Sequence, residues 1–309
     1  MKKIGLLVGL VLIGSSVAFN FIEKEKDRLI NEKIADVKEN YKVDVKFKDS
    51  SYSYFDDKLV LNKVTVQGYE IKSIIINNGR SNPDYIDIEV EELKIPTEHI
   101  KNLVSDMQKT EKLKSLINHI SKNEEFFTIN GSVLDLVDKS GETISTEILV
   151  DMENVAKITS KIKVNNIPVE VFKVENLKTW FLKMDEKKME KLSKLSVLPS
   201  YLKIETQGLM ISVREYLIKE EMKTNEELIN QLDFGIDKIK KNKSLPKIIS
   251  SNVFNAIESL REGKEYFIKL NLEKELNLDK ISKEKIVFKR ATEKEIKDAL
   301  GISLTSKSI

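Results

Sequence analysis

The 309-residue chain contains no cysteine and only two histidines, His99 and His119. Without cysteine it can form no disulfide, no thiolate nucleophile, no cysteine-ligated zinc site and no cysteine-held iron–sulfur cluster. The two histidines lie at opposite ends of one predicted helix, roughly 30 Å apart at ~1.5 Å per residue, which is too far to share a metal ion. These absences exclude most catalytic and metal-binding classes.

An excess of charge of one sign is also lacking, because 52 Lys and Arg residues stand against 50 Asp and Glu residues. A formal charge of +2 gives no general means of neutralising a phosphate backbone, so we expect no nucleic-acid partner. The only Gly-Lys pair, Gly263-Lys264, lacks both the leading glycine and the following Ser or Thr of a phosphate-binding loop. No G-x-G-x-x-G or G-x-S-x-G motif is present. We therefore predict no catalytic, cofactor-binding or metal-binding residues, and a protein that is not an enzyme.

The N-terminus gives the clearest positive signal. Lys2 and Lys3 precede an apolar run from Ile4 to Ile22 that is interrupted only by two serines and an asparagine. At ~1.5 Å per helical residue the run spans roughly 28 Å, close to the ~30 Å hydrocarbon core of a bilayer.

Two interpretations of this run stay open. As an uncleaved anchor, the helix continues through Phe19 and Phe21, aromatic residues that favour the membrane interface. As a signal peptide, Ser16 and Ala18 would be the small residues before a cut at Phe19, and residues 1–18 would be removed. Both place the bulk of the chain outside the cytoplasm, because the basic pair stays inside. We predict a single-pass membrane protein with the bulk of its chain outside the cytoplasm.

Strand-like alternation dominates the region after the anchor. From Tyr41 the apolar period becomes two, as a half-buried strand requires. Strands are predicted over 41–47, 59–66, 71–76, 86–95, 126–136, 143–150, 169–174, 201–207 and 266–272. Short connections between the first four indicate an antiparallel meander, with a bulge at Glu91-Glu92 where the alternation slips.

Helical spacing appears in four further segments, over 100–120, 185–195, 211–222 and from 224 to 262. Thr224 and Glu227 form a capping box that opens one helix, Pro246 fits the start of another, and Gly263 fits its end. The last residues, 301–309, have little to bury and are expected to be frayed.

The expected fold class is α+β, a curved antiparallel β-sheet with packed helices, preceded by an N-terminal transmembrane helix. The expected parts are the anchor over 1–22, a juxtamembrane helix over 23–40, a β-rich extracytoplasmic domain over 41–207, a helical subdomain with a returning strand over 208–290, and a tail over 291–309.

Three groups of residues are candidates for contact with a ligand or partner. Val43, Val45, Ile86 and Ile88 are candidates for an apolar sheet face, although the sequence does not separate an open face from a covered one. Trp180 is a candidate interface residue, with a place in the core as the alternative. The acidic residues Asp84, Asp87, Glu89, Glu91 and Glu92 are expected on a solvated sheet face, with a hard-cation site as the alternative.

Two stretches together resemble a known group. The first is the Lys-Lys start and glycine-spaced apolar helix, with a charged helix ending near Tyr41 and then strands with Tyr52, Tyr54 and Phe55. The second runs from Gly208-Leu209 through 224–228 and 254–257 to 266–272. The layout is similar to the YdgA-like and AsmA-like families of bacterial envelope proteins. The resemblance implies a β-rich envelope protein and, through the AsmA-like relatives, a link to lipid homeostasis and transport between membranes; it assigns no catalytic residue.

The anchor and the resemblance predict a non-enzymatic, membrane-anchored periplasmic protein of the cell envelope that contacts lipid and serves envelope maintenance. The expected partners are the inner membrane, phospholipid, and an envelope protein or a second copy of the chain. The alternative function is a scaffold or accessory subunit of an envelope protein complex, docking through the sheet edge or Trp180.

Overall fold

A computed structural model describes residues 44–53, 58–78, 85–103, 110–122, 124–138, 142–167, 193–222, 224–241, 247–277 and 293–309, with the single positions 35 and 190. These residues fall into two compact units. The first takes the described residues up to Ile117 with Asn123–Leu136 and Thr146–Glu153, and the second takes Asn118–Lys122, Val137–Ser145 and the described residues from Asn154 onward. Both contain antiparallel strands and helices, so the predicted α+β class is confirmed.

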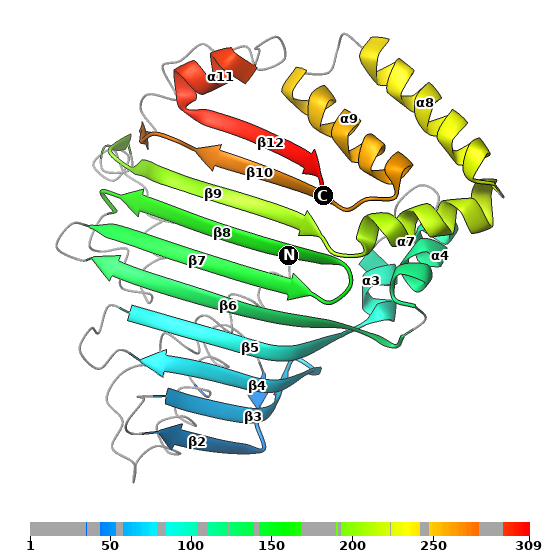
Figure 1. The fold of residues 1–309 in the computed structure, drawn as a ribbon. Coiled ribbons are helices and arrows are strands. Elements are labelled where there is room, and N and C mark those ends of the chain that lie inside the picture. Colours follow the sequence, from blue (N-terminus) through cyan, green and yellow to red (C-terminus); the bar gives the residue numbers. More distant parts are fainter. Residues whose placement is uncertain are drawn as a thin grey trace. The chain divides into compact units, whose positions relative to one another are not determined.

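The first unit is built on a meander. Its strands are β1 (Val45–Lys46), β2 (Asp49–Ser53), β3 (Lys58–Val66), β4 (Tyr69–Asn78), β5 (Tyr85–Pro96), and most of β6 (Phe126–Asp138) and β7 (Thr143–Met152). β3, β4, β5 and β6 pair antiparallel in sequence order (Figure 1). β1 and β2 both pair with β3. Two helices, α3 (Thr97–Leu103) and α4 (Thr110–Ile120), follow β5. The predicted meander is confirmed.

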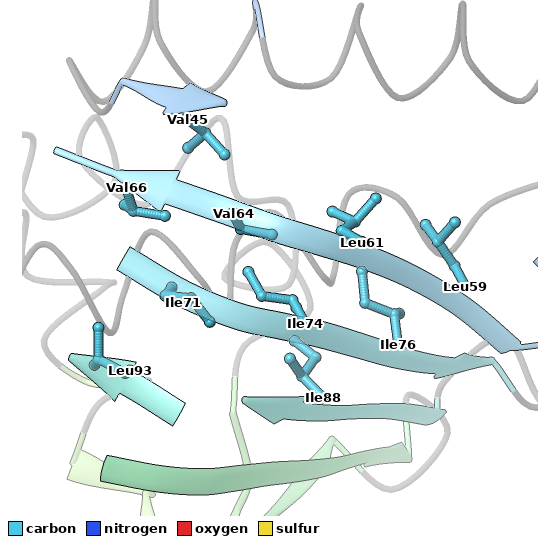
Figure 2. Close-up of a cluster of buried hydrophobic side chains, with 10 residues drawn as sticks. All are labelled: Val45, Leu59, Leu61, Val64, Val66, Ile71, Ile74, Ile76, Ile88 and Leu93. Carbon is cyan, nitrogen blue, oxygen red and sulfur yellow. The ribbon is translucent and has the colours of Figure 1, made fainter. Parts of the chain in front are cut away.

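One face of this meander forms the core of the first unit. Leu59, Ile76 and Ile88 are opposite one another on β3, β4 and β5, and each is at most 2% exposed. Figure 2 shows the ten side chains of this cluster on β1, β3, β4 and β5, namely Val45, Leu59, Leu61, Val64, Val66, Ile71, Ile74, Ile76, Ile88 and Leu93. Burial of each such side chain stabilises the fold by about 1.5–3 kcal/mol.

The predicted bulge in β5 is confirmed. The pairing of β5 with β6 shifts between Val90 and Leu93, and Glu92 has a positive φ of 50°. The extra residue keeps Val90 and Leu93 on the same apolar face, which an uninterrupted two-residue period would not do.

The second unit combines a sheet with helices. Its strands are β8 (Ala156–Asn165), β9 (Ser196–Thr206), β10 (Tyr266–Leu272), β11 (Leu276–Asn277) and β12 (Ile302–Ser308). Its helical segments are α7 (Leu209–Tyr216), the π-helix η3 (Leu217–Met222), α8 (Asn225–Lys241), α9 (Lys247–Glu262) and α11 (Glu293–Leu300). β8, β9, β10 and β12 pair antiparallel in that spatial order (Figure 1). β11 pairs with β9.

The predicted helix boundaries around α8 and α9 have the expected chemistry. The Glu227 backbone N–H donates to Thr224 Oγ1 at 3.2 Å, and the Thr224 backbone N–H donates to Glu227 Oε2 at 3.2 Å. This reciprocal pair confirms the capping box. Gly263, which follows α9, has φ +67°, as a C-terminal glycine cap requires.

The prediction that the chain end is frayed is wrong. β12 pairs with β10 from Ile302 to Ser308, and the Ser306 and Ser308 side chains form hydrogen bonds with α9. Backbone pairing with β10 and the side-chain hydroxyls of Ser306 and Ser308 therefore hold the chain end in an ordered strand.

Several predictions lie outside the described residues. These are the N-terminal anchor or signal peptide, nearly all of the juxtamembrane helix, the strand over 169–174, most of the helix over 185–195, Val43 and Trp180. Within the parts of the chain that the structure describes, no helix has the length and apolar character needed to cross a membrane.

Gly208 sits where the chain passes from β9 into α7. Its φ of 101° is in the left-handed region, and a Cβ atom built there would lie 2.7 Å from the Asn154 carbonyl oxygen. Only glycine therefore fits without strain or movement of the neighbouring backbone. Gly235 in the middle of α8 is the opposite case, since nothing lies within 4 Å of its Cβ position.

The two glycines predict stability changes of opposite sign. Gly208→Ala should reduce the free energy of unfolding by about 1–3 kcal/mol, because it forces a non-glycine residue into a left-handed, crowded position. Gly235→Ala should increase it by about 0.5–1 kcal/mol through better helix propensity. Urea unfolding followed by circular dichroism measures both, and a Gly208→Ala protein as stable as wild type would contradict the assigned backbone geometry.

Candidate functional site

The strands of the second unit sort their side chains onto two chemically different faces. Residues directly opposite one another in an antiparallel pair point to the same face, so the register defines what each face contains. One row of the first face is Ser160, Leu202, Leu270 and Leu304, from β8, β9, β10 and β12. The next row on that face is Ile158, Ile204, Ile268 and Ser306. This face is therefore predominantly apolar across the four strands.

Three large apolar side chains of this face are exposed to solvent. Leu202 is 37% exposed and Leu270, directly opposite it, is 42% exposed. Ile162 is 43% exposed and follows Lys161, which is opposite Tyr201 on the other face. The β8–β9 register shifts between Lys161 and Lys163, but the extra residue belongs to β9, so β8 keeps its own alternation and Ile162 lies on the apolar side. We call Ile162, Leu202 and Leu270 the open apolar patch.

Helix α9 covers one end of the same face. The Asn255 side-chain amide donates to Ser306 Oγ at 2.9 Å, and Ser259 Oγ lies 2.5 Å from Ser308 Oγ. The Tyr266 hydroxyl donates to a backbone carbonyl of α9 at 3.0 Å. The strand residues of these contacts all belong to the apolar face. Helix α9 therefore binds the apolar face through polar contacts at the end that contains Ser306 and Ser308, and the open apolar patch remains exposed.

The patch offers an occupant hydrocarbon contact. Leaving a leucine side chain exposed forfeits part of the roughly 1.5–3 kcal/mol that its full burial would contribute. Contiguous exposed apolar surface on neighbouring strands is typical of a ligand or partner site. The arrangement can hold an apolar chain or an apolar protein surface by van der Waals contact.

The candidate apolar face named from the sequence has a different place. Val45 is 5% exposed and Ile88 is 2% exposed, and both belong to the core cluster of the first unit (Figure 2). For these two residues the structure shows the covered alternative. Ile86 is in β5, opposite Asp135, but its side chain lies outside the described residues, as do Val43 and Trp180.

The residues of the open apolar patch were not among the sequence candidates. The strands containing Leu202 and Leu270 were predicted, but β8 was not, because Ser160 interrupts the alternation of Ile158 and Ile162. The available signal was that Ile158, Ile162 and Val164 still fall on one face of a strand, with Ser160 as the polar residue among them.

The acidic residues of β5 lie on a sheet face as expected. Glu91 accepts a hydrogen bond from the Ser73 hydroxyl at 2.5 Å, and the Asn77 amide donates to Asp87 at 3.1 Å and to Glu89 at 3.2 Å. Ser73 and Asn77 on the neighbouring strand β4 thus donate hydrogen bonds to these carboxylates. Asp84 lies outside the described residues.

The two histidines make separate aromatic contacts. The His99 ring meets the Tyr69 ring edge-on at 5.4 Å in the first unit. In the second unit His119 lies 5.8 Å from the Tyr216 ring and 3.8 Å from a Glu215 oxygen. No group of three potential metal ligands occurs among the residues that the structure describes.

One buried carboxyl stands apart from these surface groups. Asp135 on β6 is two residues beyond Val133, which is opposite Ile88, so it lies on the apolar side of its strand. Burial raises the pKa of Asp135 above its ordinary value of 3.8, and a hydrogen bond with Thr146 offsets part of this effect. Its Oδ1 atom is buried with no hydrogen-bond partner. With no second titratable group described at the position, Asp135 bears on stability and suggests no reaction.

Comparison of the chain with protein-family models finds no match, and comparison with curated proteins finds none either. The assignment of a function therefore depends on the residues and on the resemblance described above.

Asp135 predicts a specific pH dependence. The folded state holds its proton more tightly than the unfolded chain does, so this residue favours folding most below pH 3.8, and that contribution is lost as the pH rises through the raised pKa. Asp135→Asn cannot ionise, so its stability relative to wild type should increase from pH 4 to pH 7 in urea unfolding.

Other carboxyl groups with shifted pKa values change the stability of wild type and of the Asp135→Asn variant by the same amount. Hydrogen bonds from Lys264 and Lys297 lower the pKa values of Glu262 and Glu273, which adds stability with rising pH in wild type and variant equally. Parallel stability curves for the two proteins would show that Asp135 is not desolvated.

Proposed function

We propose that this chain is a non-enzymatic, membrane-anchored protein of the bacterial envelope that contacts lipid acyl chains through the open apolar patch. The observation that carries the proposal is the row of exposed leucines on neighbouring strands, Leu202 and Leu270, with Ile162 on the same face. Acyl chains match this surface because they need hydrocarbon contact and no hydrogen-bond partner.

The sequence adds the location. Lys2 and Lys3 before the apolar run of 4–22 support a single-pass inner-membrane anchor with the bulk of the chain in the periplasm. The resemblance to YdgA-like and AsmA-like proteins supports a role in envelope maintenance. In this proposal the sheet is curved, and its apolar face shields bound chains from water while α9 closes one end.

The lipid contact predicts a loss of co-purified phospholipid on substitution in the patch. Full-length protein extracted in mild detergent should carry phospholipid detectable by native mass spectrometry. The double variant Leu202→Gln, Leu270→Gln should lose most of it and remain folded, because both side chains are already about two-fifths exposed.

The matched control removes exposed apolar side chains elsewhere in the same unit. Phe234 on α8 is 63% exposed and Val253 on α9 is 38% exposed, so Phe234→Gln, Val253→Gln should keep the lipid. Ile88→Asp is the reference for loss of folding, because an unpaired charge buried in the core should unfold the first unit. Equal lipid in the patch and control variants, or lipid-free wild type, would contradict the proposal; a stoichiometric protein partner in place of lipid would favour the scaffold function.

The proposed location makes a topology prediction. Alkaline phosphatase fused after Ile309 should be active, because it folds only outside the cytoplasm, and a cytoplasm-only reporter at the same place should be inactive. Deleting residues 2–22 should reverse both results. An inactive phosphatase with an active cytoplasmic reporter on the intact chain would contradict the extracytoplasmic location. A mature N-terminus at Phe19 would show that residues 1–18 are a cleaved signal peptide and not an anchor.

A further inference from the structure

The second face of the β8–β9–β10–β12 sheet is basic. Its rows run across the four strands in the same register that defines the apolar face. They are Lys157, Glu205, Phe267 and Lys307; then Thr159, Lys203, Lys269 and Thr305; then Lys161, Tyr201, Asn271 and Ser303. Five lysines thus face one glutamate, in a chain whose total charge is only +2. We call these five lysines with Tyr201 and Phe267 the basic face.

Aromatic rings hold the central lysines of this face. The Lys203 ammonium lies 5.3 Å from the centroid of the Phe267 ring, and the Lys269 ammonium lies 4.9 Å from the centroid of the Tyr201 ring. Both distances are within the range of cation–π attraction. Lys203 also forms an ion pair with Glu205 of the neighbouring row, with Nζ 2.7 Å from Oε1. The rings therefore position two ammonium groups above the middle of this sheet face.

The chemistry of this face calls for an anionic partner that is broad. Four strands at ~4.8 Å spacing distribute the lysines over a width of roughly 14 Å, which exceeds a single linear strand of phosphates. Stacking of nucleic-acid bases would need free ring faces, but Lys203 and Lys269 lie over the rings of Phe267 and Tyr201. A bilayer surface containing anionic phospholipid offers a plane of phosphates and needs no stacking.

We propose that the basic face binds the anionic phospholipid surface of a bilayer. The inference goes beyond the lipid contact proposed above, because it assigns phospholipid headgroups to different residues on the opposite side of the sheet. It shares the membrane location with that proposal and does not require acyl chains in the open apolar patch.

A vesicle-capture experiment with the full-length protein tests this surface. The chain is reconstituted into phosphatidylcholine nanodiscs, which shield the apolar N-terminal segment, and is then offered large vesicles of pure phosphatidylcholine or of phosphatidylcholine with 30% phosphatidylglycerol. Capture should require phosphatidylglycerol and should weaken steeply with salt, since surface charges are screened. Each lysine near such a surface contributes about fivefold in affinity. Lys203→Gln, Lys269→Gln should therefore bind roughly 25-fold more weakly.

The matched control changes the same charge on another surface of the second unit. Lys238 and Lys241 are exposed on α8, and Lys238 also lies over an aromatic ring, that of Phe234, at 4.4 Å. Lys238→Gln, Lys241→Gln should change capture less than twofold. Circular dichroism confirms folding of both variants, and if the central pair fails to fold, Lys157→Gln, Lys307→Gln takes its place with the same expectation.

Three results would overturn the proposal. They are capture that does not depend on phosphatidylglycerol, equal capture by the central and control variants, and binding of a single-stranded oligonucleotide or an acidic protein through Lys203 and Lys269 without vesicle capture. Loss of co-purified phospholipid in the Leu202→Gln, Leu270→Gln protein is measured separately, so either proposal can fail alone.

Discussion

The register between β9 and β10 is the constraint on which both surfaces of the second unit depend. It places Leu202 opposite Leu270 and Lys203 opposite Lys269. Because side chains alternate with a period of two, a slip of one residue would mix leucine and lysine on each face. Thr206 at the end of β9 helps to prevent this slip, since its hydroxyl accepts from the Tyr266 N–H at 2.8 Å and donates to the Tyr266 carbonyl at 3.1 Å.

Local sequence patterns predicted the features that depend on neighbours in the chain, and they missed the strands that depend on pairing with distant segments. The slip in alternation at Glu91-Glu92 predicted the bulge of β5, and Thr224 with Glu227 predicted the start of α8, because each depends on neighbours in the chain. β8 and β12 were missed because serine occupies positions on their apolar faces. Pairing with neighbouring strands determines the structure of β8 and β12, and no local sequence pattern indicates that pairing.

The candidate site was harder to predict, because exposure is a property of what packs on a face. Val45 and Leu270 both belong to alternating strands, yet Val45 is 5% exposed and Leu270 is 42% exposed. The sequence therefore predicted an apolar sheet face and placed it on strands whose apolar side is core. The near-neutral composition likewise concealed the sorting of charge, with acids on one face of β5 and lysines on one face of β8–β12.

Contact between the open apolar patch and acyl chains is the central claim, and the absence of native cysteine allows a direct test. A nitroxide attached to Leu270→Cys in the full-length, reconstituted protein reports whether oxygen, which dissolves in lipid, or a water-soluble nickel chelate reaches that position. The claim predicts that oxygen relaxes this label more than the chelate does, with the reverse order for a label at Val253→Cys on α9. A Leu270→Cys label that the chelate reaches as readily as the label at Val253→Cys would contradict lipid contact at the patch.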